Sequence, residues 1–201
     1  IAERHDLKII SIEDLIKYRL EKETLISEVL RVPMPMEYGD FEIVGFEDTT
    51  NDRHVFALVK GTWEEDEPIL VRVHSSFTSS DVFGALMGDG GSQLHAALEQ
   101  IKNEGKGVLL YIGQDTGGVE LMSKLKDYAR MRREQVSLQD MQQRLRRSMD
   151  QREYGIGAQA LRHLGVGKIR LLTNNPRRRV GLIGYDLEIV ENVPLALKKR
   201  T

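Results

Sequence analysis

The chain has 201 residues, enough for one good-sized domain or two small ones. Lys and Arg total 29 against 31 Asp and Glu, and this near-zero net charge excludes binding to nucleic acid through a large positive field. No apolar run approaches the ~20 residues needed to span a bilayer, so we expect no membrane partner. The chain has no cysteine, which excludes disulfides, thiolate metal ligands and thiol nucleophiles.

The first residues do not resemble an export signal. The chain begins at Ile1 rather than Met, and residues 1–5 are typical of the interior of a helix. A charged segment followed by an apolar one, as in a signal peptide, is not found there. We therefore expect the sequence to be part of a longer, cytoplasmic protein.

The leading segment predicts a strand followed by a helix. Residues 7–12 are rich in Ile, which favours a strand. Ser11 is followed by two acidic residues, a pattern typical of a helix N-cap with acids in the first turn. The helix is expected to continue to about Ser27. Pro33 and Pro35 then interrupt the helical pattern.

The rest of the chain alternates between segments with strand-like and helix-like patterns. Runs of β-branched and aromatic residues predict strands, and apolar residues at helical spacing predict helices. The expected strands are residues 41–48, 54–61, 68–75, 107–112, 168–173 and 187–193. The expected helices are residues 91–104, 119–147 and 155–164. Strands that alternate with helices in the second half predict an α/β architecture.

Six segments carry a resemblance to a known family. They are RVHSS (72–76), DVFGAL (81–86), DGGSQLHAAL (89–98), GVLLY (107–111), DQREYGIGAQALRHLGV (150–166) and KIRLLTNNP (168–176). With them, the chain from about residue 33 to about 195 resembles GTP cyclohydrolase II, which starts riboflavin synthesis. The resemblance implies an α/β fold with a mixed sheet flanked by helices.

The leading segment carries a second resemblance. HDLKIISIEDLIKYR (5–19) is similar to the C-terminal end of dihydroxybutanone-phosphate synthase, which many bacteria fuse in front of GTP cyclohydrolase II. The expected organisation is a synthase remnant and linker over 1–32, and a cyclohydrolase II-like domain over 33–201. The expected partners are the fused 3,4-dihydroxy-2-butanone 4-phosphate synthase domain and a second copy of the chain. Magnesium is expected only with the missing synthase domain.

The resemblance also implies a chemistry for which this chain lacks the metal ligands. The family opens the imidazole ring of GTP and releases formate and pyrophosphate, using zinc held by three cysteines. Those positions are Phe77, Gly88 and Gly90, which offer no donor atom. We therefore expect no zinc and no other cofactor. His74 and Asp81 lie nearby, but a catalytic zinc needs three ligands in tetrahedral geometry, so local hydrogen-bonding roles are expected for both.

The nucleotide pocket implied by the family has also changed. After the strand GVLLY, the family's two arginines are Gly113 and Gly117 here, and Glu120 replaces a glycine. In RVHSS, Ser76 replaces a glutamate. Losing a guanidinium removes bidentate phosphate contacts, and an added carboxylate repels an anionic ligand. These changes predict weak or lost nucleotide binding.

Other family positions are retained, and they have two interpretations. The nucleotide contacts that the resemblance carries over are Arg72, Gln93, Asp115, Thr173 and Arg178. Asp150 and Arg152 match the family's proton acceptor and nucleophile, and we expect them to be vestigial. In one interpretation these residues keep a residual GTP or phosphate site. In the other, Asp150 and Arg152 cap the following helix, and Thr173 belongs to a strand-ending turn.

Three functions are compatible with this sequence. The first is a catalytically degenerate domain that supports or regulates the fused synthase, with the Arg-rich residues 130–147 as a docking surface. The second is a GTP-binding sensor module. The third is an enzyme that hydrolyses GTP without zinc, using Asp150 and Arg152. The missing zinc ligands favour the first two over the third, and the missing arginines favour the first over the second.

Overall fold

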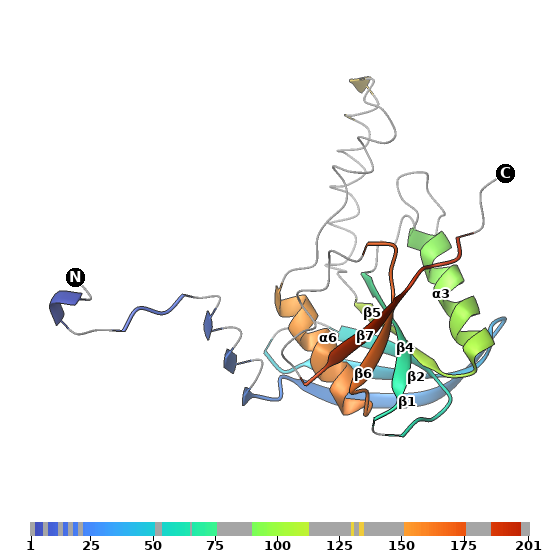
Figure 1. Cartoon of the computed structure of the whole chain (residues 1–201), viewed down its shortest axis with the longest axis horizontal. Helices are drawn as coiled ribbons and strands as arrows, with labels where there is room; N and C mark the ends of the chain where they lie inside the picture. Colours follow the sequence, from blue (N-terminus) through green and yellow to red (C-terminus); the bar gives the residue numbers. More distant parts are fainter. Residues whose placement is uncertain are drawn as a thin grey trace.

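A computed structural model shows how these segments assemble (Figure 1). It describes residues 3–5, 8–11, 14–15, 18–19, 22–50, 54–64, 66–75, 90–112, 130, 133–134, 151–175 and 186–197. The elements are η1 (Glu3–His5), β1 (Ile26–Met36), β2 (Gly39–Asp48), β3 (His54–Lys60), β4 (Pro68–Ser75), α3 (Gly90–Glu104), β5 (Gly107–Ile112), α6 (Gln151–His163), β6 (Lys168–Leu172) and β7 (Glu188–Val193). The described strands form one sheet in the order β1-β2-β3-β5-β4-β6-β7.

The sheet is half antiparallel and half parallel. β1, β2 and β3 form an antiparallel meander, and β3 pairs antiparallel with β5. β5, β4, β6 and β7 are parallel neighbours. Parallel neighbours need a crossover connection, and α3 lies between β4 and β5 in the chain, as α6 lies between β5 and β6. The α/β fold with a mixed sheet and flanking helices, expected from the sequence, is confirmed.

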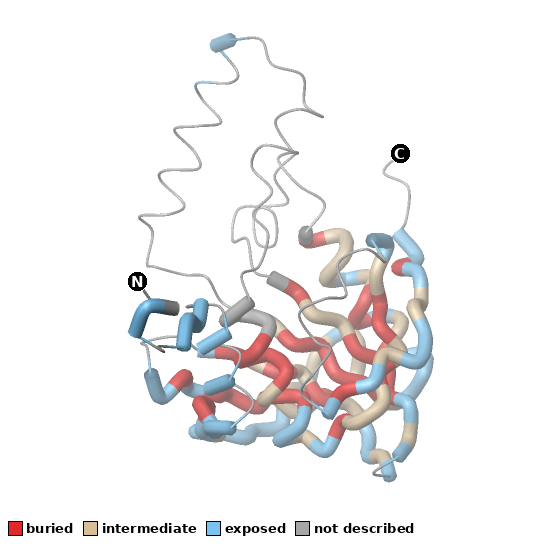
Figure 2. Tube along the Cα trace, turned by 60° about the vertical axis from the view of Figure 1, so that its left-hand side comes forward, coloured by how far each residue is buried: buried red, intermediate tan, exposed pale blue. Residues whose placement is uncertain are grey.

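Each face of the sheet has its own apolar core (Figures 1 and 2). On one face, α6 packs through Ile156 and Leu161 against a cluster that includes Val108 and Leu110 of β5. On the other face, α3 packs through Ala97, Leu98 and Ile101 against a cluster that includes Leu109. Consecutive residues of β5 therefore alternate between the two cores. This burial on both faces is what the nearly continuous apolar run predicts.

The strands and helices expected after residue 40 are confirmed wherever the structure describes them. β2, β3, β4, β5, β6 and β7 coincide with the six expected strands to within about two residues, the usual uncertainty of such boundaries. α3 coincides with the helix expected over 91–104, whereas α6 begins at Gln151, four residues before the helix expected over 155–164. The third, residues 119–147, lies outside the described residues except for Arg130, Arg133 and Glu134. In the described part of the chain, no helix is both long and apolar enough to cross a membrane.

The leading segment differs from its prediction. Residues 8–11 have no regular structure, and Ile9 and Ile10 are 83% and 66% exposed, so the strand expected over 7–12 is not formed in its described part. A strand needs a partner, and no described strand pairs with this segment. The N-cap is confirmed, because the backbone N–H of Asp14 donates to Ser11 Oγ at 3.0 Å.

The expected helix also ends earlier than Ser27, because β1 begins at Ile26. Pro33 and Pro35 lie inside β1, which is the edge strand. Since the two prolines are two residues apart, their missing N–H groups face the same side of the strand, and an outer edge tolerates this. The prolines therefore do not end an element here. The boundary near residue 32 stays a prediction, and β1 passes through that residue.

Candidate functional site

The topology points to one edge of the sheet. β4 and β5 are parallel neighbours. The next helix after β4 is α3, which covers one face of the sheet, and the next described helix after β5 is α6, which covers the other face. In open α/β sheets, ligands bind outside the carboxyl ends of strands at such a switch point. The edge is marked by Ser75 and Ile112, which end the two strands in register.

The alternation of side chains along β4 sets the face of the sheet on which Arg72 lies, three residues before the strand ends at Ser75. Leu70 belongs to the core on the α3 face, so Arg72, two residues later, projects to the same face. Its Nη2 donates to Oε1 of Gln93 at 2.6 Å, and its Nη1 donates to the carbonyl oxygen of Leu172 at 3.0 Å. Hydrogen bonds from an ionised donor are stronger than neutral ones. One guanidinium therefore joins β4, α3 and β6.

Thr173 follows Leu172 directly and lies in a turn. Its backbone N–H donates to the carbonyl of Val193 at 2.9 Å, and its Oγ1 accepts from the backbone N–H of Asn175 at 3.0 Å. This is the strand-ending turn that the second interpretation expects. Arg72, Gln93 and Thr173, separated by up to 101 positions in the sequence, are thus brought to one edge.

Sequence reasoning missed two partners at this edge, Tyr111 and the carbonyl of Leu172. The buried ring of His74 stacks on the ring of Tyr111, with centroids 5.6 Å apart and planes inclined by 18°. His74 and Tyr111 are paired in the parallel register of β4 and β5. His74 therefore has a ring contact that the sequence did not predict, and the local hydrogen-bonding role expected of it stays a prediction. The only available signal was its spacing of two from Arg72, which puts both residues on one face.

The amino ends of α3 and α6 follow the carboxyl ends of β4 and β5. The first turn of α3 holds Gln93 and contains no acidic residue. The partial positive charge of a helix N-terminus favours an anion, and a carboxylate in that turn would oppose it. Arg152 is the second residue of α6. The amino end of α3 therefore favours a negatively charged group.

Several expected site residues lie outside the described residues. They are Phe77, Asp81, Gly88, Asp115, Asp150 and Arg178. Gly90 is the first residue of α3. A phenyl ring and two glycines supply no donor atom, so the side chains at the zinc positions do not fit that metal. Within the described residues, no group of three or more His, Cys, Asp or Glu side chains could hold a metal ion.

Comparison with known proteins decides the family. The family model described as GTP cyclohydrolase II matches residues 27–194. The chain belongs to the GTP cyclohydrolase II family. It is 46% identical over 198 residues to riboflavin biosynthesis protein RibBA of Parabacteroides distasonis, covering 98% of this chain and 49% of the relative. It is 47% identical over 195 residues to the protein of that name from Porphyromonas gingivalis, covering 97% of this chain and 48% of the relative.

This member of the GTP cyclohydrolase II family spans about half the length of the curated relatives it matches. It is also similar to a solved structure described as RibBX, a two-domain 3,4-dihydroxy-2-butanone 4-phosphate synthase from A. baumannii. The TM-score is 0.58 and the sequence identity 29%, and the match covers 93% of this chain and 46% of that one. The two structures share the fold, and this chain again corresponds to about half of a longer protein.

Proposed function

We propose that the chain is a degenerate GTP cyclohydrolase II domain of a riboflavin biosynthesis protein. In this proposal it does not open GTP. It supports or regulates, by contact, a 3,4-dihydroxy-2-butanone 4-phosphate synthase domain in the same longer chain. The names of the RibBA relatives and of the RibBX structure support the pathway and the synthase partner.

One observation carries the loss of activity. The positions at which the family holds zinc are Phe77, Gly88 and Gly90, and none has a lone pair to donate. Attack of water on a purine ring at neutral pH needs an activated nucleophile, which a zinc site supplies by lowering the pKa of its bound water. A chain without the donors has no such nucleophile.

The geometry of Arg72 supports the same conclusion. Its two terminal nitrogens are hydrogen-bonded to Gln93 and to the carbonyl of Leu172, so the guanidinium ties the domain together. Gly113 and Gly117 stand where the family has arginines, so two further cations for a triphosphate are missing. The RibBX protein supports the role, because its description names a two-domain protein by synthase activity alone.

A GTP-binding sensor is the second candidate. It is favoured by the convergence of Arg72, Gln93 and Thr173 at the switch point, beside the amino end of α3. A sensor would bind GTP without opening it. GTP hydrolysis without zinc, the third hypothesis, has no support among the described residues.

The test combines metal analysis with turnover. We expect the purified chain to hold no stoichiometric zinc after dialysis, and to release no formate from GTP with added zinc and magnesium. A triple variant with Phe77→Cys, Gly88→Cys and Gly90→Cys is the matched control, because it restores three thiolates and should retain zinc. Formate release by the unmodified chain, abolished by Arg152→Ala, would overturn the proposal.

Calorimetric titration with GTP separates the two candidates. The degenerate domain predicts no binding at micromolar GTP, whereas the sensor predicts binding that Gln93→Ala weakens. The supporting role is tested in the longer protein by comparing synthase turnover and melting temperature with and without residues 33–201. Equal values would show that the domain neither supports nor regulates the synthase.

A further inference from the structure

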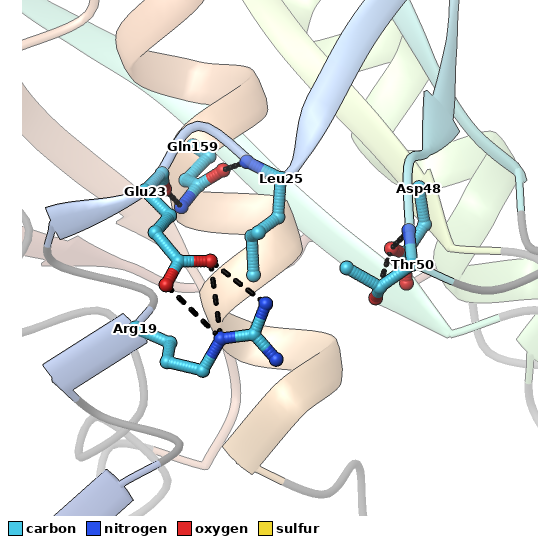
Figure 3. Close-up of polar contacts among 6 residues, drawn as sticks. All are labelled: Arg19, Glu23, Leu25, Asp48, Thr50 and Gln159. Atoms are coloured by element: carbon cyan, nitrogen blue, oxygen red, sulfur yellow. Dashed lines mark hydrogen bonds and ion pairs between the residues drawn. The ribbon is translucent and has the colours of Figure 1, made fainter.

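The chain enters the domain through a helical turn that is closed by an ion pair. The backbone N–H of Glu23 donates to the carbonyl of Arg19 at 2.7 Å. The Arg19 guanidinium also binds the Glu23 carboxylate, with Nη2 to Oε2 at 2.8 Å (Figure 3). This pairing of residues four apart is typical of a helix. The last carbonyls of such a helix need partners from elsewhere in the molecule.

Gln159 of α6 supplies that partner. Its Nε2 donates to the carbonyl of Glu23 at 2.8 Å, and its Oε1 accepts from the backbone N–H of Leu25 at 2.8 Å (Figure 3). One amide group therefore holds the backbone on both sides of Thr24, just before β1. Because both bonds go to the backbone, they fix the course of the chain and not only one side chain.

Residues 25–28 contact both α6 and the end of β2. Leu25 and Ile26 are 8% and 5% exposed and belong to the core on the α6 face. The carbonyl of Leu25 accepts from the backbone N–H of Thr49, just after β2, at 2.9 Å. Two residues beyond Ile26, Glu28 binds His163 in the last turn of α6 at 2.8 Å. The entering chain is thus fastened to α6 and to the end of β2.

We propose that residues 22–28 form a rigid joint, with Gln159 as its positioning residue, which fixes the orientation of the segment ahead of residue 22 relative to α6. This inference rests on the proposed function, because the segment it orients is the one that leads to the synthase domain. A flexible tether is rich in Gly and Ser and lacks such backbone fastening. Residues 22–28 contain no Gly and no Pro.

The chain offers a matched control at its other end. Gln100 of α3 makes the same kind of clamp on the leaving chain, with Nε2 donating to the carbonyl of Pro194 at 3.0 Å and Oε1 accepting from Ala196 N–H at 3.1 Å. Gln100→Ala removes as many backbone hydrogen bonds as Gln159→Ala, but away from the joint.

The test uses the absence of cysteine, because spin labels attach only where a cysteine is introduced. Spin labels at Tyr18→Cys and Lys102→Cys report the distance between the segment ahead of residue 22 and α3. We expect a narrow distribution of label-to-label distances. Gln159→Ala should broaden this distribution, and Gln100→Ala should leave it narrow. Exchange of the Leu25 amide, followed by NMR, should accelerate about tenfold in Gln159→Ala, as expected for the loss of a hydrogen bond.

Gln159→Glu provides a second variant in case the alanine variant does not fold. It keeps the acceptor for Leu25 N–H and loses the donor to the Glu23 carbonyl, so an intermediate width is expected. If the width of the distance distribution is unchanged in both Gln159 variants, the proposal of a rigid joint is overturned. Equal broadening in Gln100→Ala would overturn it as well.

Synthase turnover in the longer protein separates this inference from the proposed function. If Gln159→Ala broadens the distances while removal of residues 33–201 leaves turnover unchanged, the joint stands and the supporting role fails. If removal of the domain changes turnover but Gln159→Ala leaves the distances narrow, the supporting role stands and the joint fails.

Discussion

Arg72, which the family resemblance assigns to nucleotide binding, has contacts that serve the fold. Its guanidinium donates to a side chain on α3 and to the carbonyl of Leu172 at the end of β6. An incoming phosphate would have to replace charge-assisted bonds that already exist. A short side chain at position 72 would leave the Leu172 carbonyl without this donor, so retention of Arg72 does not require a ligand.

The charge cluster around Glu28 gives a prediction about pH. Arg31, with a smaller contribution from His163, holds the pKa of Glu28 below its ordinary value. A lowered folded-state pKa stabilises the protein above the unfolded value of about 4.3, and this contribution is lost as the pH falls through the lower folded value. Glu28→Gln should therefore cost about 0.2–1 kcal/mol at pH 7, because the pair is partly exposed and screened.

The measurement is urea denaturation of wild type and Glu28→Gln at pH 7 and at pH 3. We expect the difference in unfolding free energy found at pH 7 to shrink as the pH falls below about 4.3, because the carboxyl group is then increasingly protonated. Glu188→Gln, on an exposed position of β7, is the control for removing one carboxylate. A difference that does not change with pH would show that packing, not charge, causes the effect.

Tyr38 gives a second titration at the tip of the β1–β2 hairpin. Partial burial, helped by the neighbouring Glu37, raises the pKa of Tyr38 to about 12. Its hydroxyl lies 2.6 Å from Nδ1 of His95 on α3. The folded state thus favours the neutral phenol, and the stability gained is lost as the pH rises from about 10 towards 12. The difference between the ultraviolet titrations of wild type and Tyr38→Phe should have its midpoint near pH 12. A midpoint near pH 10 would contradict the buried environment.

The junction between α3 and β5 depends on two glycines that play different parts. Gly107 starts β5 with a φ of +155°, and a Cβ placed there would in addition lie 2.7 Å from the carbonyl oxygen of Leu70 and 3.1 Å from Ile101. Gly105 has a φ of +83° and open space around it. A backbone oxygen cannot move aside as the end of a side chain can. The close approach of α3 and β4 therefore requires glycine at position 107.

We expect Gly107→Ala to lower the unfolding free energy by about 3 kcal/mol, the upper range for overpacking. Gly105→Ala should cost about 1 kcal/mol, from its left-handed backbone alone. Thermal and chemical denaturation of the two variants measures the difference. Equal losses would show that backbone conformation, and not the contact with Leu70, decides both positions.

At the scale of the whole molecule, the oligomeric state stays a prediction. Val29, Leu30 and Val32 on the edge strand β1 are between 40% and 48% exposed, and burying such side chains favours association. Light scattering at micromolar concentration should give twice the chain mass of 22.9 kDa. A mass of one chain over a tenfold range of concentration would contradict the homodimer.

The residues of the candidate site could be predicted where a family motif contains them. Their contacts with other strands and helices could not be predicted. Arg72, Gln93 and Thr173 were named from the resemblance, and the structure brings all three to one edge. The partners that hold Arg72 and His74 at that edge, the carbonyl of Leu172 and the ring of Tyr111, were not expected. Sequence patterns describe which face a residue occupies, but not which atom of a distant strand it meets.

The sequence by itself determined the order and type of the elements that the structure describes after residue 40, the two-sided burial of β5 and the N-cap at Ser11. Each depends on short-range spacing, which is written in neighbouring residues. Only the tertiary structure decided that residues 8–11 remain without a described strand partner, that Pro33 and Pro35 lie within an edge strand, and that Gln159 binds the backbone of Glu23 and Leu25. The physical reason is that backbone N–H and C=O groups must find partners, and residues far away in the chain determine which partners are within reach.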